Sequence, residues 1–218
     1  MSGVRCQVPY FETLAGIMKK YPDIRAVIID FGFTVSSDYY FRELGPQYTD
    51  RIAQFVFSRD SEIGRRWMGG LISSHEVSER LSDCLGLSAD EIHSVLARGC
   101  SQTSFNQSVW NFARTQRADG RKLALVTGDV DIVREVIVPS HGLDREFDSI
   151  VSSSEFGVEL PSKQPLWDAA FDALGPKFGY ANSLLIEDTR REVELFRDRG
   201  GTAYQYRNDQ EFDDCLNS

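Results

Sequence analysis

The sequence lacks a cysteine motif, a long apolar run and a leader-like N-terminus, and each absence excludes a class of protein. Its four cysteines, Cys6, Cys84, Cys100 and Cys215, are far apart and form no CxxC pair, which argues against a zinc site and a disulfide framework. No apolar run approaches the ~20 residues that span a bilayer. The N-terminal residues MSGVRCQVPYFETL contain no apolar signal-peptide core. We therefore expect a cytoplasmic protein with free thiols and no membrane partner.

The chain also lacks a basic excess. It has 24 basic and 33 acidic residues, and a formal net charge of −9 at pH 7. Sequence-independent nucleic-acid binding requires a basic surface, so we expect no nucleic-acid partner. The 218 residues suffice for one large domain, or for a core with a smaller insertion. The sequence does not indicate an oligomeric state.

What the sequence does contain is an alternation of short apolar runs with helical stretches. Near-continuous apolar runs separated by helices are typical of a parallel sheet covered on both faces. The pattern predicts an α/β fold with a Rossmann-like, doubly wound parallel sheet. The five predicted strands are residues 26–30, 122–128, 149–153, 183–188 and 202–206.

One long helical stretch interrupts this alternation after the first strand. Residues 73–86 have a helical pattern, and Ser88, three residues before Glu91, predicts a capping box for the next helix. The stretch leaves the sheet at the edge where open α/β sheets bind ligands, which favours a lid over a decorative insertion. We predict a core of residues 1–36 and 106–218 and a helical cap of residues 37–105.

Polar groups follow three of the predicted strands at their C-terminal ends. A carboxylate directly after a buried strand is costly unless it is paired or bound to metal. Two strands that end in carboxylates suggest a shared hard cation, and oxygen ligands suit Mg²⁺. For Asp188 taken alone, a helix N-cap is the alternative. The groups are Asp30 and Thr34, then Thr127 and Gly128, then Glu187 and Asp188.

In order and spacing these groups resemble the motifs of the haloacid-dehalogenase-like (HAD) hydrolase superfamily, in the subfamily with a helical cap after the first motif. The resemblance covers nearly all of residues 25–207. The first motif, DxDxT, matches Asp30-Phe31-Gly32-Phe33-Thr34 except at its second aspartate. The second is a Thr or Ser that ends a strand, here Thr127. The fourth, an acidic pair with a further acid, matches Glu187, Asp188 and Glu192.

The third family motif is a lysine ahead of a helix. Lys163 is the candidate, in ELPSKQPLWDAAFDALG. Its spacing to the helix differs slightly from the commonest pattern, and Leu160 stands where many relatives have lysine. The next lysine, Lys177, lies beyond that helix. We therefore assign the motif to Lys163, with a solvated surface lysine as the alternative.

The resemblance implies a metal-assisted covalent mechanism. Asp30 would attack the substrate and form an aspartyl intermediate. Mg²⁺ would be held by Asp30, Asp188 and the backbone carbonyl of Gly32, and Glu187 would bind it directly or through water.

The resemblance also implies how the substrate is held. Thr127, Gly128 and Lys163 would bind the phosphoryl oxygens of a small phosphorylated metabolite, with Thr127 and Lys163 in catalytic roles. Thr34 and Glu192 would orient these groups without reacting.

Gly32 is the main departure from the family. Phosphatases of the family have a second aspartate there, which protonates the leaving group and later activates water. Loss of such a group typically costs ~10²–10⁴ in rate. A good leaving group, such as an acyl phosphate, would relax the need for it, and a deliberate Asp-to-Gly change is a further alternative. The nearby substitutes are Asp38, Asp129, His75 and His93, each of which is also explained as a turn, cap or surface residue.

Other activities of the family fit less well. Haloacid dehalogenases proper carry a tyrosine at this position and have no acidic fourth motif. Phosphonatases have a small residue there but use a cap lysine, and no lysine stands between Lys20 and Lys122. Two interpretations remain: a Mg²⁺-dependent phosphatase-like hydrolase, or a degenerate, scarcely catalytic member that binds ligands or serves as a scaffold.

The predicted cap carries further groups of interest. An arginine of the cluster Arg59, Arg65 and Arg66 can bind an anionic substrate, or the cluster can pair with neighbouring acids. Tyr39, Tyr40 and Phe41 either line the cleft or pack at the hinge. We expect Trp67 and Met68 in the core of the cap, and Trp110 and Trp167 as core residues on helices that cover the sheet.

Overall fold

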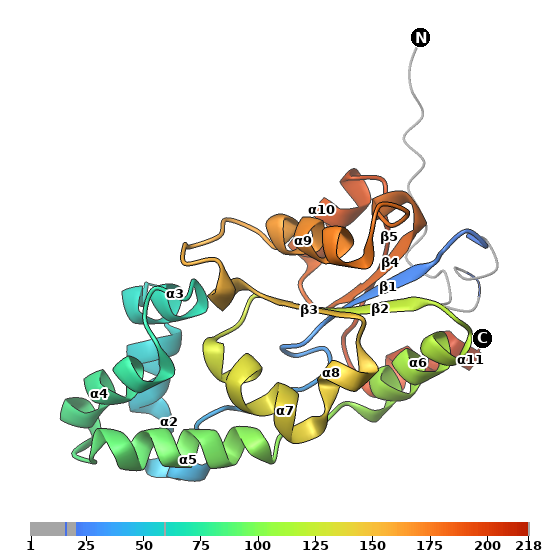
Figure 1. Ribbon diagram of the computed structural model, residues 1–218. Coiled ribbons are helices and arrows are strands. Elements are labelled where there is room, and N and C mark those ends of the chain that lie inside the picture. The colour runs from blue at the N-terminus through green and yellow to red at the C-terminus, as the bar shows by residue number, and fades with distance from the viewer. Residues whose placement is uncertain (1–15, 17–20, 59, 218) are drawn as a thin grey trace.

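A computed structural model describes residue 16 and residues 21–58 and 60–217; Cys6, Arg59 and the N-terminal stretch discussed above lie outside the described residues. The described chain contains a five-stranded parallel sheet in the order β3-β2-β1-β4-β5 (Figure 1). The α/β prediction is confirmed, and each predicted strand is present with its C-terminal end within one residue. The strands are β1 (Ala26–Asp30), β2 (Lys122–Thr127), β3 (Ser149–Ser152), β4 (Ser183–Glu187) and β5 (Thr202–Gln205).

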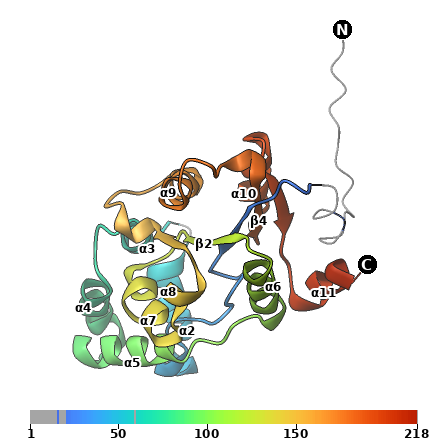
Figure 2. The same cartoon turned by 45° about the vertical axis from the view of Figure 1, so that its right-hand side comes forward.

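Helices cover both faces of the sheet (Figures 1 and 2). On one face lie α9 (Gln164–Leu174) and α10 (Arg190–Asp198). The other face is covered by α6, α7, α8 and α11, and α6 and α11 lie side by side in Figure 2. These elements, with the short helices near them, are α6 (Gln107–Ala118), η3 (Val133–Ile137), α7 (Val138–His141), α8 (Leu143–Glu146), η4 (Ser153–Glu155), η5 (Tyr180–Asn182) and α11 (Asp209–Asn217).

Each strand contributes to two hydrophobic cores because side chains alternate across a sheet. In β1, Ile28 packs in the core that contains Trp167, whereas Val27 and Ile29 pack in the core that contains Phe112. All five residues of β1 are buried, as expected for a parallel strand covered on both sides. Trp167 is in the core as predicted, whereas Trp110 is only partly buried and packs against the edge of the core. No helix in the described part of the chain is both long and apolar enough to cross a membrane.

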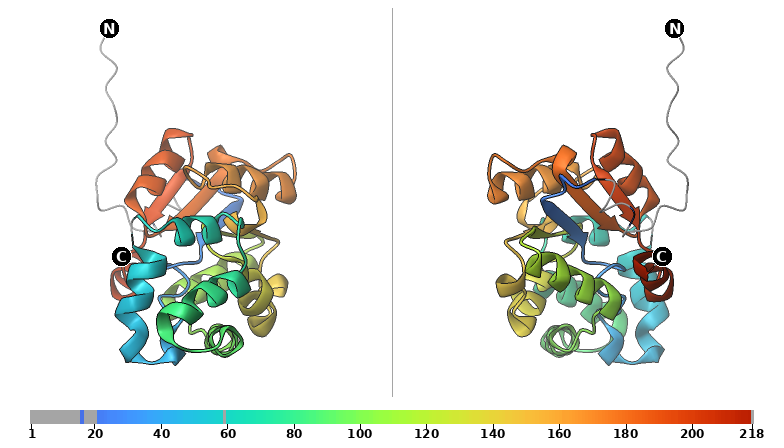
Figure 3. Two further views of the ribbon diagram at one scale, coloured as in Figure 1. Left: turned by 90° about the vertical axis from the view of Figure 1, so that its left-hand side faces the viewer. Right: turned by 90° about the vertical axis from the view of Figure 1, so that its right-hand side faces the viewer.

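The helical stretch between β1 and α6 gathers beside the sheet, at the left of Figure 1, and Figure 3 (left) views the molecule from that side. We call it the insertion. One continuous apolar cluster runs from the sheet into the insertion, so packing alone does not separate two domains, and the division at residues 37 and 105 stays a prediction. Its elements are η1 (Arg42–Leu44), α2 (Pro46–Ile52), the π-helix η2 (Ala53–Phe57), α3 (Glu62–Met68), α4 (Ser74–Leu85) and α5 (Ala89–Ser101).

Two local expectations in the insertion need correction or refinement. Trp67 is fully buried, but Met68 is 40% exposed because the end of α3 turns toward a cleft; the prediction of a buried Met68 was wrong. Ser88 accepts a hydrogen bond from the Glu91 amide, which is one half of the predicted capping box. A complete box begins α4 instead, at Ser73.

One carboxylate ties the insertion to the loop after β2. Asp131 Oδ1 accepts from Trp67 Nε1 at 2.7 Å, and its Oδ2 accepts from the Ser74 amide at 2.8 Å. The Ser74 hydroxyl also donates to Asp131. Nearby, a Cβ on Gly70 would stand 1.8 Å from the Ser154 carbonyl oxygen, so the α3–α4 connection touches the core backbone. We call the contacts of Asp131 with Trp67 and Ser74 the Asp131 link.

We predict that Asp131→Ala lowers the free energy of unfolding by about 1–3 kcal/mol, because it removes the acceptor of the Ser74 amide and leaves the buried indole N–H of Trp67 only its longer 3.2 Å bond to the Ser74 hydroxyl oxygen. Urea denaturation measures the change. Asp172→Ala, on the exposed surface of α9, is the matched control and should leave stability within about 0.5 kcal/mol. Equal stability of the Asp131 variant and the wild type would contradict the importance of the link.

Candidate active site

Lys163 lies between the two carboxylates that end β1 and β4. Its Nζ is 2.6 Å from Asp30 Oδ1 and 2.8 Å from Glu187 Oε2. Asp30 is 2% exposed and Glu187 is fully buried, so both carboxylates have lost almost all contact with water. Lys163 itself is 17% exposed in its side chain, and it is therefore not a solvated surface lysine.

The pKa of each group moves in a direction set by burial and pairing. Burial opposes the charge on Lys163, but Asp30 and Glu187 outweigh it and raise the pKa of Lys163. Burial raises the pKa of both carboxyl groups, and the Lys163 charge acts in the opposite direction. The three groups therefore depend on one another for their ionised forms.

Asp188 completes a set of oxygen ligands. Asp30, Glu187 and Asp188 each offer a carboxylate oxygen, and these atoms lie within 4.8 Å of one another. With all groups ionised, the three carboxylates and Lys163 leave a net charge of −2, which a divalent cation would balance. Oxygen ligands around such a charge fit Mg²⁺.

The two residues of the acidic pair are placed differently. Glu187 Oε1 accepts from the Thr189 amide at 3.0 Å, and Oε2 faces Lys163, so both of its oxygens already have partners. Asp188 is partly exposed, and its side chain accepts a longer 3.3 Å bond from the Thr189 hydroxyl. By this comparison Asp188 is better suited than Glu187 to direct metal ligation, and Glu187 to ligation through water.

Two further sequence-predicted residues hold this centre in place. Thr34 is fully buried, and its hydroxyl lies 3.5 Å from Asp30 Oδ2, at the limit of a hydrogen bond. Glu192 accepts from the Lys163 amide at 3.1 Å, which fixes the start of α9. Both residues contact the centre, and their supporting roles stay a prediction.

The end of β2 brings the second motif next to the first. β1 and β2 pair with Asp30 opposite Val126, so Thr127 lies one residue further along the neighbouring strand. Thr127 is buried, and a Cβ on Gly128 would come within 3.4 Å of Lys163 Cε. The structure thus brings Asp30, Thr127, Gly128 and Lys163 to one point at the C-terminal edge of the sheet, where such folds bind ligands.

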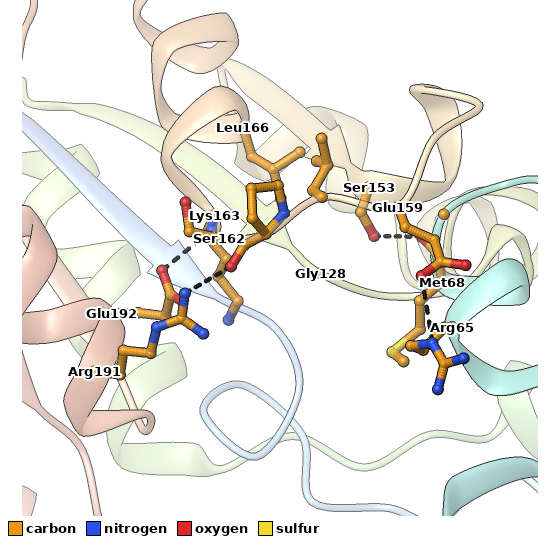
Figure 4. A pocket seen from close by; sticks show the side chains of 13 residues that line it. Arg65, Met68, Gly128, Ser153, Glu159, Ser162, Lys163, Leu166, Arg191 and Glu192 are labelled. Carbon is orange, nitrogen blue, oxygen red and sulfur yellow. Dashed lines mark hydrogen bonds and ion pairs between the residues drawn. The ribbon is translucent and has the colours of Figure 1, made fainter. Parts of the chain in front are cut away.

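A cleft of about 280 Å³ opens beside this point (Figure 4). Gly128 and Lys163 line it from the core, and Arg65 and Met68 line it from α3. Asp30, Thr127 and Asp188 are not among its lining residues. Arg65 pairs with Glu159 at 3.3 Å, and both side chains are nearly half exposed. Of the predicted arginine cluster, Arg65 lines the cleft in addition to pairing with Glu159. Arg66 pairs with the neighbouring acid Glu62, which was the alternative for the cluster.

The four proposed substitutes for a carboxylate at residue 32 have different surroundings. Asp38 accepts from the Ser104 amide at 2.7 Å and is occupied there. The rings of His75 and His93 contact one another at a tilt of 56° within the insertion, with centroids 5.6 Å apart. Asp129 alone lies beside Gly32, where its carboxylate accepts a hydrogen bond from the Tyr40 hydroxyl.

Sequence reasoning missed the partners of these residues. Tyr40 and Asp129 are 89 positions apart, and their pairing has no signature in the chain. Burial raises the pKa of both groups. Phe33 was also missed: it is 69% exposed and has a φ of 58°, a left-handed conformation that is uncommon for a bulky residue. The only sequence signal for this left-handed residue was that the chain must turn directly after β1.

We predict that Lys163→Ala lowers the free energy of unfolding by about 3–5 kcal/mol, because it leaves two buried carboxylates without their cation. Adding Glu187→Gln should restore part of this loss, because one unpaired charge is removed. Urea denaturation at pH 7 measures both variants, with the exposed Lys177→Ala as control. A Lys163 variant as stable as the control would show that the ion pairs do not support the fold.

Comparison with solved structures finds this fold in HAD-family proteins. A HAD-family enzyme from Bacteroides thetaiotaomicron, solved in complex with magnesium and inorganic phosphate, matches with a TM-score of 0.64 and 16% identity, over 84% of this chain and 94% of its own. A predicted HAD-like family hydrolase from Porphyromonas gingivalis matches with a TM-score of 0.63 and 17% identity, over 85% and 92%. For the L-2-haloacid dehalogenase of Xanthobacter autotrophicus the TM-score is 0.60, with 18% identity over 87% and 80%.

No family model and no curated protein matches the sequence. At these low identities the likeness to solved structures is one of fold. It agrees with the five-stranded parallel sheet flanked by helices. The chain therefore has the fold of the haloacid-dehalogenase-like superfamily.

Proposed function

We propose that this protein is a Mg²⁺-dependent, phosphatase-like hydrolase of a small phosphorylated metabolite, with Asp30 as its nucleophile. The observation that carries the proposal is the buried centre of Asp30, Lys163 and Glu187 with Asp188 beside it. The magnesium and phosphate of the Bacteroides enzyme support it from a protein of the same fold.

In this proposal Asp30 Oδ attacks phosphorus and forms an aspartyl-phosphate. Lys163, Thr127 and the Gly128 amide hold the phosphoryl oxygens, because they lie near Asp30 at the C-terminal edge of the sheet. Mg²⁺, when bound, would neutralise charge on the phosphoryl group.

The metal would be held by Asp30, Asp188 and the carbonyl of Gly32, with Glu187 acting through water. Thr34 and Glu192 keep Asp30 and Lys163 in position.

We further propose that residues 37–105 form the cap and residues 1–36 and 106–218 the core. Arg65 and Met68 reach the cleft from α3, which supports a role of the insertion in enclosing the substrate. Dehalogenation is a competing activity, because a haloacid dehalogenase has the same fold. The acidic cluster favours phosphate chemistry, because a metal-dependent reaction uses those carboxylates. A cytoplasmic location remains part of the proposal.

The proposed metal site predicts stabilisation by Mg²⁺. A ligand at a hundredfold excess over its Kd stabilises the folded state by about 2.7 kcal/mol, which raises Tm by several degrees in a chain of this size. Asp188→Asn removes a direct ligand and should abolish most of this shift. The control is Asp198→Asn, at the exposed end of α10. A full shift in the Asp188 variant would place the metal elsewhere.

The proposed nucleophile predicts the effect of Asp30→Asn on hydrolysis of 4-nitrophenyl phosphate with Mg²⁺. We expect kcat/KM to fall at least about 10³-fold, because the covalent step is lost. Mass spectrometry of acid-quenched wild-type enzyme should find a phosphoryl group on Asp30. The exposed Asp172→Asn variant should retain full activity.

Two results would contradict this proposal. Activity that survives in Asp30→Asn would require a different nucleophile. A wild-type chain that binds Mg²⁺ and phosphate but hydrolyses no ester would favour the binding-module alternative.

A further inference from the structure

The side chain that Gly32 lacks leaves a space, and a carboxylate from the loop after β2 borders it. A Cβ on Gly32 would meet Asp129 Oδ2 at 3.4 Å, and it would meet no other atom of the described residues within 4 Å beyond its own chain neighbours. An aspartate at residue 32 would carry its carboxylate oxygens about 2.4 Å from its Cβ, from standard bond lengths. Asp129 Oδ2 therefore lies about 1 Å further from that Cβ than the oxygens of the missing group would.

Asp129 is held in this position from several sides. Its Oδ1 accepts from the Val130 amide at 2.9 Å, and its backbone carbonyl accepts from the Ser152 hydroxyl at 2.9 Å. Its Oδ2 accepts from the hydroxyl of Tyr40, which enters from the start of the insertion. The carboxylate is thus fixed by the ends of β2 and β3 on one side and by Tyr40 on the other.

This pair lies within electrostatic reach of the proposed reaction centre. Burial raises the pKa of Asp129 and of Tyr40, and the charges of Lys163 and Asp30 contribute to the shifts of Asp129 and Tyr40 respectively. Asp129 also directly follows Gly128, which lines the cleft. A plain helix cap would need only the Val130 contact, and it would explain neither the Tyr40 bond nor the open space at Gly32.

We propose that Asp129 is the catalytic proton donor and acceptor that Gly32 cannot be, and that Tyr40 is its positioning residue. The proposal rests on the proposed function. In the first step Asp30 Oδ bonds to phosphorus, the bond from phosphorus to the ester oxygen breaks, and the Asp129 carboxyl gives its proton to that oxygen. In the second step Asp129 takes a proton from water as the water oxygen bonds to phosphorus. The bond from phosphorus to Asp30 then breaks, which releases inorganic phosphate.

The test compares phosphate esters with good and poor leaving groups, from 4-nitrophenyl phosphate to phenyl and alkyl phosphates, with Mg²⁺ present. Proton donation matters most when the leaving group is poor. For Asp129→Asn we expect kcat/KM to fall ~10²–10⁴-fold with poor leaving groups and far less with 4-nitrophenyl phosphate. Tyr40→Phe keeps the ring and removes the hydroxyl, and it should produce a smaller change of the same kind.

Two further variants separate chemistry from folding. The exchange Gly32→Asp with Asp129→Gly returns the carboxylate to the first motif and should restore the shallow leaving-group dependence of the wild type. Gly32→Asp alone should not increase activity, because it brings two carboxylates together. The exposed Asp144→Asn is the control.

These outcomes distinguish the role of Asp129 from the proposed hydrolase function on which it rests. An active wild type whose Asp129→Asn variant loses activity equally with every ester, or loses none, overturns the role of Asp129 alone. A wild type inactive with all esters, or an active Asp30→Asn variant, overturns the proposed function. A selective loss with poor leaving groups, recovered in the exchange variant, supports both.

Discussion

Burial raises the pKa of Asp30 and Glu187 at the ends of adjacent strands, and the charge of Lys163 between them opposes this rise. The arrangement depends on register: β1 and β4 pair with Ile29 opposite Ile186, so the two acids end their strands side by side. A shift of one residue would turn one of them into a core face, because strand side chains alternate. The strand register that buries the apolar side chains of the sheet is therefore the same register that brings the two acids together.

Much of this could be predicted from the sequence, and the reasons are local. The five strands are short apolar runs between helices, and such runs are typical of buried parallel strands. Asp30, Glu187 and Asp188 were found because each directly follows such a run. Lys163 was chosen because the acids require a cation, although its spacing alone did not identify it.

Contacts between side chains that are far apart in the sequence could not be predicted from it. Tyr40 and Asp129 bond across 89 positions, and Met68 is exposed only because α3 ends at the cleft. The loop after β1 shows a second limit. Phe33 holds a left-handed backbone at a cost of about 1–2 kcal/mol, and such strain persists only where the surrounding contacts hold it. Here the Phe33 amide donates to the Ser36 carbonyl at 2.7 Å, which closes the turn over Thr34.

The Asp131 link has a kinetic consequence. Asp131 is two residues from Asp129, and it bonds to the insertion through Trp67 and Ser74. If the insertion swung away from the core, it would have to break these bonds or pull on the loop that carries Asp129. In the proposed function, the exchange of substrate would therefore be coupled to the local stability of this loop. A substitution that weakens the link would then speed product release and also disturb the alignment of the carboxylate beside Gly32.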